Sequence, residues 1–315
     1  MSKVKKVLLI IISVVLVLAL ATIGVAGNYF YNLALNPKTS KEKVFGTKDK
    51  SVEASNVAVS NWITDKSGYK DAFIDSIDDL QLHGYEIINT NPSKTWVITV
   101  HGYMGQGKEM EGYANAFYNM GYNVLVPDLR GHGKSEGKYI GMGWDDRKDI
   151  LSWIDYILQK DSDANIVLHG VSMGGGTVMM TSGEDLPGNV KAIIEDCGYT
   201  SVWDEFSYQL DSLFGLPEFP VLQSASLVSK IRAGYWLQDA SAIDQLAKSK
   251  TPMLFIHGDK DTFVPYSMLD KVYNSANVEK EKLVVEGAAH AQASKTNPQL
   301  YWGTIRKFIK NYIAN

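Results

Sequence analysis

The stretch NIVLHGVSMGGG at 165–176 sets the architecture expected of this chain. An apolar run of strand character, Asn165–His169, leads into Gly-Val-Ser-Met-Gly at 170–174, and a helical pattern continues from Met173 to Ser182. A G-x-S-x-G motif between a strand and a helix makes a sharp turn that lifts the serine oxygen above the end of a sheet. The two glycines lack a Cβ, so the strand and the helix can approach each other closely. We therefore predict Ser172 as a nucleophile.

Short β-rich runs alternate with longer amphipathic stretches on both sides of this motif. The predicted strands are Ala72–Ser76, Leu80–Ile88, Trp96–Val100, Asn123–Val126, Asn165–His169, Ala192–Glu195, Met253–His257 and Lys282–Val285. The predicted helices are Lys108–Met120, Trp144–Gln159, Met173–Ser182, Tyr266–Ser275 and Pro298–Tyr312. The first two strands are close enough for a hairpin, whereas the later ones need helical crossovers. The pattern predicts an α/β fold with a mostly parallel eight-stranded sheet, helices on both faces and its site at the carboxyl ends of the strands.

The segment between Tyr199 and Lys250 breaks this alternation. It contains three helical, aromatic-rich stretches: Ser201–Phe214, Gln223–Tyr235 and Ala240–Ala247. We interpret about 200–250 as a small helical cap, with two ordinary crossover helices as the alternative. The candidate substrate-binding residues in it are Trp203, Phe206, Phe214 and Trp236. They would line an apolar acyl pocket, or simply pack the helices together.

A serine hydroxyl needs a neighbouring imidazole that accepts its proton. The chain has six histidines. In this architecture the base lies on a loop at the carboxyl end of the sheet and follows the acid in sequence. Of the six, His290 meets both conditions, because it follows the last predicted strand and precedes the last predicted helix. We predict His290 as the general base, with a surface-loop histidine as the plain alternative.

The acid that orients this base is expected in the loop after the strand Met253–His257. That loop reads Gly-Asp-Lys-Asp-Thr-Phe-Val-Pro at 258–265 and offers two carboxylates. Asp261 lies beyond the tight turn, where it can reach an imidazole, whereas Asp259 is better placed to hold the turn together through backbone N–H groups. We favour Asp261, which would fix the tautomer of His290 and stabilise the imidazolium.

An oxyanion site is expected beside the serine. The N–H of Met173 lies at the start of a helix and points toward the space above Ser172. The predicted strand Trp96–Val100 ends in His-Gly-Tyr-Met-Gly at 101–105, where the N–H of Tyr103 could be a second donor. The Tyr103 ring would line the substrate entrance or pack against neighbours.

Composition excludes several other classes of protein. Lysine and arginine number 31 against 35 acidic residues, so no basic excess suggests nucleic-acid binding. The single cysteine, Cys197, rules out an intrachain disulfide framework and a multi-cysteine zinc site. The sequence contains no H-E-x-x-H motif or other metal-ligand spacing. We expect no metal and no organic cofactor.

The N-terminus has the pattern of a membrane anchor. Lysines stand at 3, 5 and 6, and an uncharged apolar run extends from Val7 to Ala26. Some 20 helical residues span roughly 30 Å, the thickness of the hydrocarbon core of a bilayer. Tyr29–Tyr31 suits an interfacial aromatic belt, and the lysines predict residues 1–6 on the cytoplasmic side and the remaining chain outside. A cleaved signal peptide, which would leave a secreted protein, is the competing interpretation. Residues 27–60, polar and lysine-rich from Asn36 onward, would link this segment to a domain at 61–315.

Five motifs in order give the chain a resemblance to a known family: HGYMG, DLRGHGKS, GVSMGG, GDKDTFVP and EGAAH. From about Asp71 to Ala314 the chain resembles the α/β-hydrolase superfamily, most of all the serine-aminopeptidase-like and monoacylglycerol-lipase-like hydrolases, including membrane-anchored examples of Gram-positive bacteria. The resemblance implies hydrolysis through an acyl-enzyme. It implies Ser172, Asp261 and His290 as the triad, with Tyr103 and Met173 as oxyanion donors.

These observations predict a serine hydrolase that cleaves a carboxylic ester, such as an acyl-lipid or another hydrophobic ester. An aminopeptidase or amidase acting on short peptides is the first alternative. It would need acidic residues of the cap to hold an α-amine, for which the candidates are Asp204, Glu205, Asp211 and Glu218. A non-catalytic, membrane-anchored binding protein on the same scaffold is the second. The expected partners are a small-molecule ester or peptide and the membrane, without nucleic acid.

Overall fold

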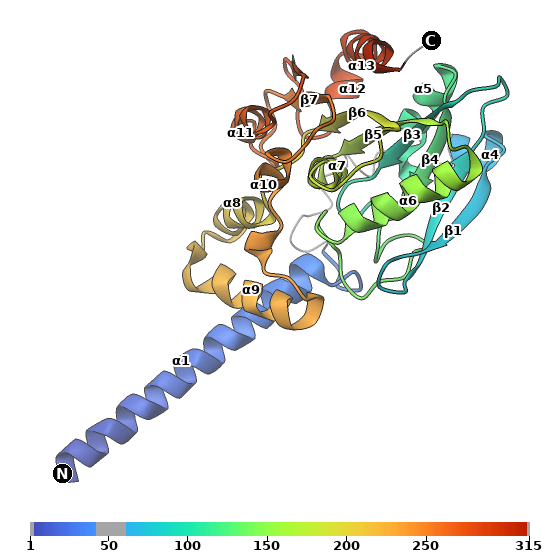
Figure 1. The fold of residues 1–315 in the computed structure, drawn as a ribbon. Coiled ribbons are helices and arrows are strands. Elements are labelled where there is room, and N and C mark those ends of the chain that lie inside the picture. Colours follow the sequence, from blue (N-terminus) through green and yellow to red (C-terminus); the bar gives the residue numbers. More distant parts are fainter. Residues whose placement is uncertain (1–2, 42–60, 314–315) are drawn as a thin grey trace.

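A computed structural model describes residues 3–41 and 61–313 of the chain. Its centre is one sheet of eight strands in the order β1-β2-β4-β3-β5-β6-β7-β8 (Figure 1). The strands are β1 (Lys70–Asp75), β2 (Gln81–Ile87), β3 (Thr95–Val100), β4 (Asn123–Pro127), β5 (Asn165–Val171), β6 (Val190–Asp196), β7 (Met253–Gly258) and β8 (Lys280–Val285). Strand β2 pairs antiparallel with β1 and β4, and all the other pairs are parallel. The predicted hairpin and mostly parallel sheet are confirmed.

Helices cover both faces of this sheet. One face carries α6 (Asp146–Lys160), α7 (Met173–Thr181) and α11 (Ser267–Ser275), and the other carries α4 (Trp62–Lys66), α5 (Glu111–Asn119), α12 (Ala293–Thr296) and α13 (Pro298–Tyr312). A 3₁₀ turn, η1 (Gly107–Met110), precedes α5, so the single helix predicted over Lys108–Met120 is a 3₁₀ turn joined to an α-helix.

The central strands are apolar throughout because both of their faces are covered. In β5, Ile166 and Leu168 point into the core on one side, whereas Val167 and Val171 belong to the core on the other. This alternation follows from the two-residue period of a strand. The sheet is therefore a buried platform, and polar groups that act on a ligand have to project from its ends.

The cap predicted at about 200–250 is present. Between β6 and β7 the chain forms α8 (Val202–Phe214), α9 (Glu218–Ala233), the 3₁₀ turn η2 (Leu237–Asp239) and α10 (Ala242–Leu246). Helix α8 begins at the N-cap Ser201, whose side chain accepts from the N–H of Asp204, and ends at Gly215 in the left-handed conformation. The cap lies over the carboxyl ends of the strands, where the predicted site is.

The N-terminal segment is a single helix, α1 (Lys3–Leu35), which stands away from the domain as a long stalk (Figure 1). By length and composition it could cross a membrane. The expected linker at 27–60 is wrong in its first part, because the helix continues through Leu35 and its last turns pack against α9. The physical reason is that Tyr31 and Leu35 are buried against the domain, which gives these residues tertiary partners. Residues 42–60 of that expected linker lie outside the described part of the chain.

Candidate active site

Ser172 occupies the sharp turn between β5 and α7. Its backbone adopts φ 58° and ψ −118°, a conformation that non-glycine residues rarely take. A Cβ on Gly170 would collide with the carbonyl group of Gly174, and one on Gly174 would collide with that of Val100. Only glycine at these two positions lets the strand and the helix meet so closely. The turn thus holds the serine at the edge of the sheet, under the cap.

Three side chains from separate loops meet at this edge. The Nε2 atom of His290 lies 2.8 Å from Oγ of Ser172, and its Nδ1 lies 2.8 Å from Oδ2 of Asp261. The carboxylate of Asp261 can only accept, so Nδ1 carries the proton and Nε2 is left to accept from the serine hydroxyl. The residues predicted from the sequence as nucleophile, base and acid are therefore joined in one hydrogen-bonded relay.

The loop after β7 gives its two carboxylates different surroundings. Oδ1 of Asp261 accepts from the N–H groups of Phe263 and Val264, at 2.9 and 3.0 Å. Burial alone would raise the pKa of Asp261, but hydrogen bonds from His257 and His290 lower it to about 2. Asp259 instead accepts from the N–H of Gly287 at 2.6 Å and ties two loops together. The geometry brings Asp261, and not Asp259, to the imidazole.

A second histidine, His257, contacts the acid, and its role is not evident from the sequence. Nε2 of the buried His257 lies 3.2 Å from Oδ2 of Asp261 and 3.0 Å from the carbonyl oxygen of Val264. Its position at the end of β7, directly before the acid's loop, is the signal that could have pointed to it. With two imidazoles and two backbone N–H groups around it, the carboxylate has few other orientations open to it.

The predicted oxyanion donors lie beside the serine. Met173 is the first residue of α7, so its N–H has no acceptor within the helix. The turn that carries Tyr103 lies close by, since a Cβ built on Gly102 would sit 3.3 Å from Cβ of Ser172. Both Tyr103 and Met173 line the pocket that contains Ser172. Their role as oxyanion donors stays a prediction.

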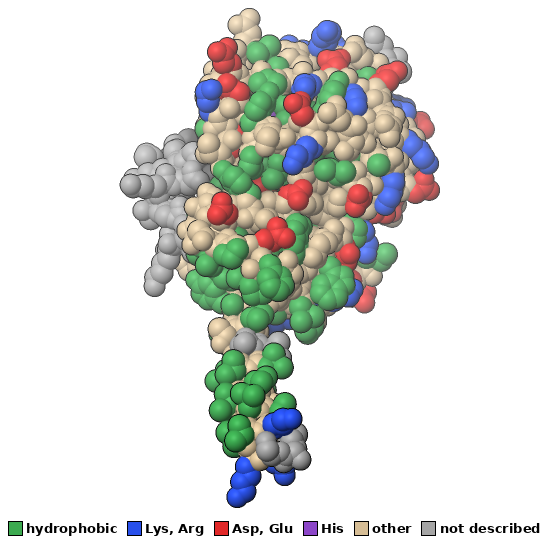
Figure 2. Space-filling view, turned by 90° about the vertical axis from the view of Figure 1, so that its left-hand side faces the viewer, with side chains coloured by type: hydrophobic (Ala, Val, Ile, Leu, Met, Phe, Trp, Pro, Cys, Tyr) green, Lys and Arg blue, Asp and Glu red, His purple; other side chains and the backbone are tan. Residues whose placement is uncertain are grey.

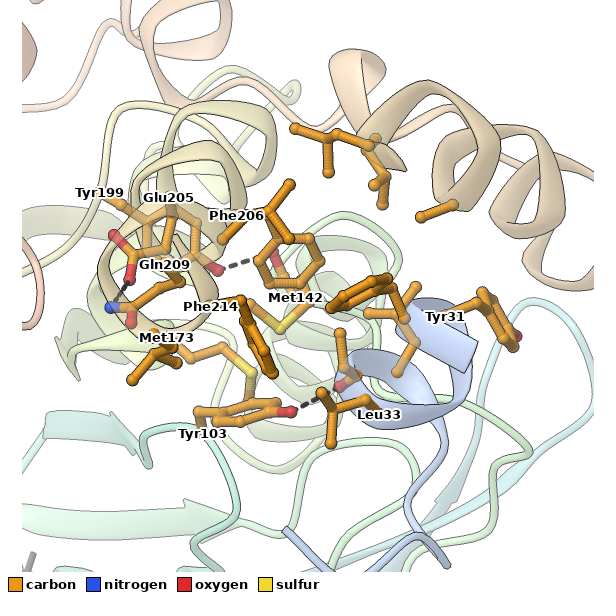
Figure 3. A pocket seen from close by; sticks show the side chains of 18 of the residues that line it. Tyr31, Leu33, Tyr103, Met142, Met173, Tyr199, Glu205, Phe206, Gln209 and Phe214 are labelled. Atoms are coloured by element: carbon orange, nitrogen blue, oxygen red, sulfur yellow. Dashed lines mark hydrogen bonds between the residues drawn. The ribbon is translucent and has the colours of Figure 1, made fainter. Parts of the chain in front are cut away.

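The serine opens into an apolar pocket between the sheet, the cap and α1 (Figure 3). The pocket region encloses about 890 Å³ of space between protein atoms, open solvent at its mouth included. Apart from Ser172, Glu205, Gln209 and three tyrosines, every lining residue is apolar. Such a lining suits a hydrocarbon chain and leaves few polar groups to orient a ligand.

Two of the four cap residues predicted to bind substrate line this pocket, and two do not. Phe206 and Phe214 contribute to its wall (Figure 3). Trp203 lies in the first turn of α8 and packs against the main core, away from the lining. Trp236 follows the left-handed Gly234 that ends α9 and is 38% exposed, while the next residue, Leu237, lines the pocket instead. Neither tryptophan lines this pocket, and substrate binding by all four residues stays a prediction.

Of the four acidic cap residues considered for binding an amine, only Glu205 lines the pocket. It is buried, its Oε1 accepts from Nε2 of Gln209 at 2.9 Å, and its Oε2 has no hydrogen-bond partner among the described residues. Burial raises the pKa of Glu205 to about 8. The carboxyl group is therefore mostly protonated near neutral pH.

Within the described ranges, one group of side chains could in principle hold a metal: Cys197, Asp261 and His290, whose ligand atoms lie within 4.8 Å of one another. The two ring nitrogens of His290 already face Ser172 and Asp261, and burial raises the pKa of the Cys197 thiol, which disfavours the thiolate that binds metals. The chemistry of these donors fits the hydrogen-bonded relay better than a metal centre.

Comparisons with known proteins agree with this fold. A family model described as serine aminopeptidase, S33, matches residues 91–214. The uncharacterized protein YqkD of Bacillus subtilis is 28% identical over 244 residues, which are 77% of this chain and 80% of that protein. The α/β hydrolase domain-containing protein WAV2 of Arabidopsis thaliana is 27% identical over 195 residues, covering 60% and 61%. The structure of a Pyrococcus furiosus esterase superposes with a TM-score of 0.63 at 24% identity, over 78% of this chain and 93% of that chain. The chain has the α/β-hydrolase fold, and its sequence is similar to members of that superfamily.

Proposed function

We propose that this protein is a serine hydrolase that cleaves carboxylic esters through an acyl-enzyme formed on Ser172. The observation that carries the proposal is the relay from Ser172 through His290 to Asp261, with both contacts at 2.8 Å. A hydroxyl group held in a strained turn against a neutral imidazole is set to lose its proton to that imidazole. The apolar pocket supports an ester with a hydrophobic acyl group over a charged substrate.

The mechanism has two acyl-transfer steps. Oγ of Ser172 attacks the ester carbonyl carbon while Nε2 of His290 takes its proton, and the N–H groups of Tyr103 and Met173 receive the oxyanion. The imidazolium then donates that proton to the leaving alcohol. In the second step His290 takes a proton from water, the hydroxide attacks the acyl-enzyme, and the acid leaves with Ser172 reprotonated. Each step uses a group of this chain.

Asp261 acts through His290 in this scheme. Its carboxylate stays ionised because its pKa lies near 2, so it balances the charge of the imidazolium in both steps. His257 contacts the same carboxylate oxygen, Oδ2, as His290 does. We assign His257 as a positioning residue for the acid.

An aminopeptidase or amidase is the second candidate, and Glu205 is the observation that favours it. An α-ammonium group placed in the pocket could pair with the free Oε2 of Glu205 and draw off its proton. The family model named for serine aminopeptidases agrees with this alternative. Against it, the other acidic cap candidates do not line the pocket, so a single carboxyl group would have to hold the amine.

We further propose that α1 anchors the protein in a membrane with the catalytic domain on the outer side. The apolar run and the flanking Lys3, Lys5 and Lys6 support a single-pass anchor at 7–26 with a short cytoplasmic N-terminus. The domain at 61–315 would carry the catalysis. Mass analysis of the protein isolated from the producing cell tests this, because signal cleavage would remove the apolar run.

The test of the enzymatic proposal uses the full chain in mild detergent beside its Ser172→Ala variant. Both are exposed to a fluorophosphonate and then to p-nitrophenyl esters and aminoacyl-anilides. Labelling and ester turnover in the parent alone would support the esterase. Turnover of anilides alone would favour the peptidase. A folded parent that neither labels nor turns over any ester would contradict both and leave a binding protein.

A further inference from the structure

The end of α1 is part of the pocket wall. Phe30, Leu33 and Ala34 line the same cavity as Ser172. Figure 3 shows Leu33 beside Tyr103 in this cavity. The ring of Phe30 packs edge-to-face on Phe214, with centroids 5.2 Å apart. A membrane anchor that only tethered a domain would have no reason to enter its pocket, so these contacts indicate a second role for the helix.

Groups of the domain hold this helix end in place. The last carbonyl groups of a helix have no partner within the helix and need one from elsewhere. Here the hydroxyl of Tyr103 donates to the carbonyl oxygen of Ala34 at 2.6 Å, and the N–H of Ile140 donates to that of Leu35 at 2.8 Å. The position of α1 is thus fixed by hydrogen bonds as well as by apolar packing.

A close helix crossing lies one turn below the pocket. Gly27 is buried against α9, and a Cβ on it would lie 2.6 Å from the backbone carbon and from Oγ of Ser224. Gly24, on the same helix, has nothing within 4 Å of such a Cβ. A larger side chain at 27 must therefore push α1 away from the cap, whereas one at 24 meets open space.

The pocket begins close to the level of the proposed membrane surface. The apolar run ends at Ala26, and at 1.5 Å per residue Phe30 lies only about 6 Å further along the helix axis. An acyl chain of a lipid in the outer leaflet would therefore start within a few ångströms of the pocket wall. It could reach the serine without crossing a layer of water.

The cap presents an apolar surface around the same point, which we call the cap rim and define as Phe219, Leu227 and Ile231. These side chains are 72%, 49% and 75% exposed, and all belong to α9, the helix that packs on α1. Figure 2 shows hydrophobic side chains gathered at the end of the domain from which the stalk emerges. Lys230 and Arg232 stand among them, as suits lipid headgroups. A lipid surface is the occupant that fits an apolar rim continuous with an anchor.

We propose that the last turns of α1, from Phe30 to Leu35, form an acyl-binding wall of the pocket, and that long-chain acyl esters enter it along this helix directly from the bilayer. The proposal rests on the proposed ester hydrolysis at Ser172 and on anchoring by α1. It makes the anchor part of the substrate site, so that chain-length preference depends on how α1 packs on α9.

The experiment compares full-length variants in phosphatidylcholine vesicles with p-nitrophenyl acetate and p-nitrophenyl dodecanoate. Gly27→Leu displaces α1 from the cap, and Ala34→Trp fills the wall. Gly24→Leu and Ala21→Trp are the matched controls at exposed positions of the same helix. We expect the ratio of kcat/KM for dodecanoate over acetate to fall at least tenfold in the first pair and to stay within twofold in the controls.

Fluorophosphonate labelling of each variant separates this inference from the proposed function. Labelled Gly27→Leu and Ala34→Trp proteins with a reduced ratio support the acyl-binding wall. If both variants are labelled and keep the parent's ratio of kcat/KM, the proposed acyl-binding wall is wrong. The cap rim would then be a contact surface for another membrane protein. If only one of the two variants is labelled, the kcat/KM ratio of that variant decides whether the acyl-binding wall is correct. A parent that neither labels nor hydrolyses either ester would overturn the ester hydrolysis itself and this inference with it.

Discussion

The residues at the carboxyl ends of the strands and the pocket above them are held in place by different kinds of interaction. At the edge, Asp261 is surrounded by two imidazoles and two backbone N–H groups, and Ser172 is fixed by a turn that only glycine neighbours allow. In the pocket, apolar side chains from α1, the cap and the core meet with few polar contacts. Under the proposed function, the chemistry depends on directional hydrogen bonds, whereas the choice of substrate depends on how the helices pack.

Removing the nucleophile should have the largest effect. Ser172→Ala is expected to lower ester kcat by roughly 10⁴-fold or more, because the oxyanion donors alone leave little catalysis. Turnover of p-nitrophenyl butyrate measures it. Ser182→Ala, at the other end of the same helix, is the control and should stay near the parent. Near-parental turnover by Ser172→Ala would place the chemistry elsewhere.

The two carboxylates of one loop give the next largest contrast. Asp261→Asn should reduce kcat by about 10³-fold, since an amide cannot hold the imidazole in the required tautomer or balance its charge. Asp259→Asn loses a loop contact with Gly287 and should change kcat only a few-fold. Equal losses in the two variants, with melting temperatures unchanged, would mean that the loop acts through its shape and not through one carboxylate.

The pH dependence of stability tests whether Glu205 is protonated in an apolar pocket. Its carboxyl keeps its proton in the folded state up to about pH 8, but loses it near 4.5 in the unfolded state. The folded state therefore binds the extra proton between these values, and the free energy of unfolding falls as the pH rises through that window. Relative to Glu205→Gln, the parent should lose about 3 kcal/mol of stability between pH 5 and pH 8.

Thermal or denaturant unfolding of both full-length proteins in detergent, at several pH values, measures this difference. Other buried carboxyl groups are common to the two proteins and cancel in the comparison. A difference that does not change with pH would show that Glu205 is ionised in a more polar pocket. That result would strengthen the case for an amine-binding site.

The smallest predicted effect is a change of KM that distinguishes cap residues that line the pocket from cap residues that do not. Phe214→Ala removes a ring that packs on Phe30, and should raise KM for dodecanoyl esters about five- to tenfold, equivalent to about 1 kcal/mol. Trp236→Ala should leave KM within twofold, because Trp236 does not line the pocket. Chain-length series on both variants supply the measurement, and the reverse ranking would show that the pocket wall runs along the other side of the cap.

The sequence was sufficient for the platform because local patterns determine it. All eight strands could be predicted from apolar runs bounded by turn residues, and the order of Ser172, Asp261 and His290 along the chain was enough to propose a site that the folded chain brings together. His257 was missed because its role depends on a contact across a loop that spacing alone does not reveal.

The pocket was less predictable because its lining depends on tertiary packing. Trp236 and Leu237 are adjacent, yet the left-handed turn at Gly234 leaves the first at the surface and directs the second inward. The aromatic run Tyr29–Tyr31 was interpreted as an interfacial belt, but Phe30 lines the pocket and Tyr31 is buried. No local pattern distinguishes a tyrosine that meets headgroups from one that meets another part of its own chain.

Tyr103 belongs to both regions at once. Its backbone follows Gly102, which lies against Ser172, while its hydroxyl group holds the carbonyl oxygen of Ala34 at the end of α1. A change in the tilt of α1 would therefore pull on a residue whose backbone N–H we propose as an oxyanion donor. For the membrane-anchored enzyme proposed above, the thickness and tension of the bilayer would then act on the active site through Tyr103.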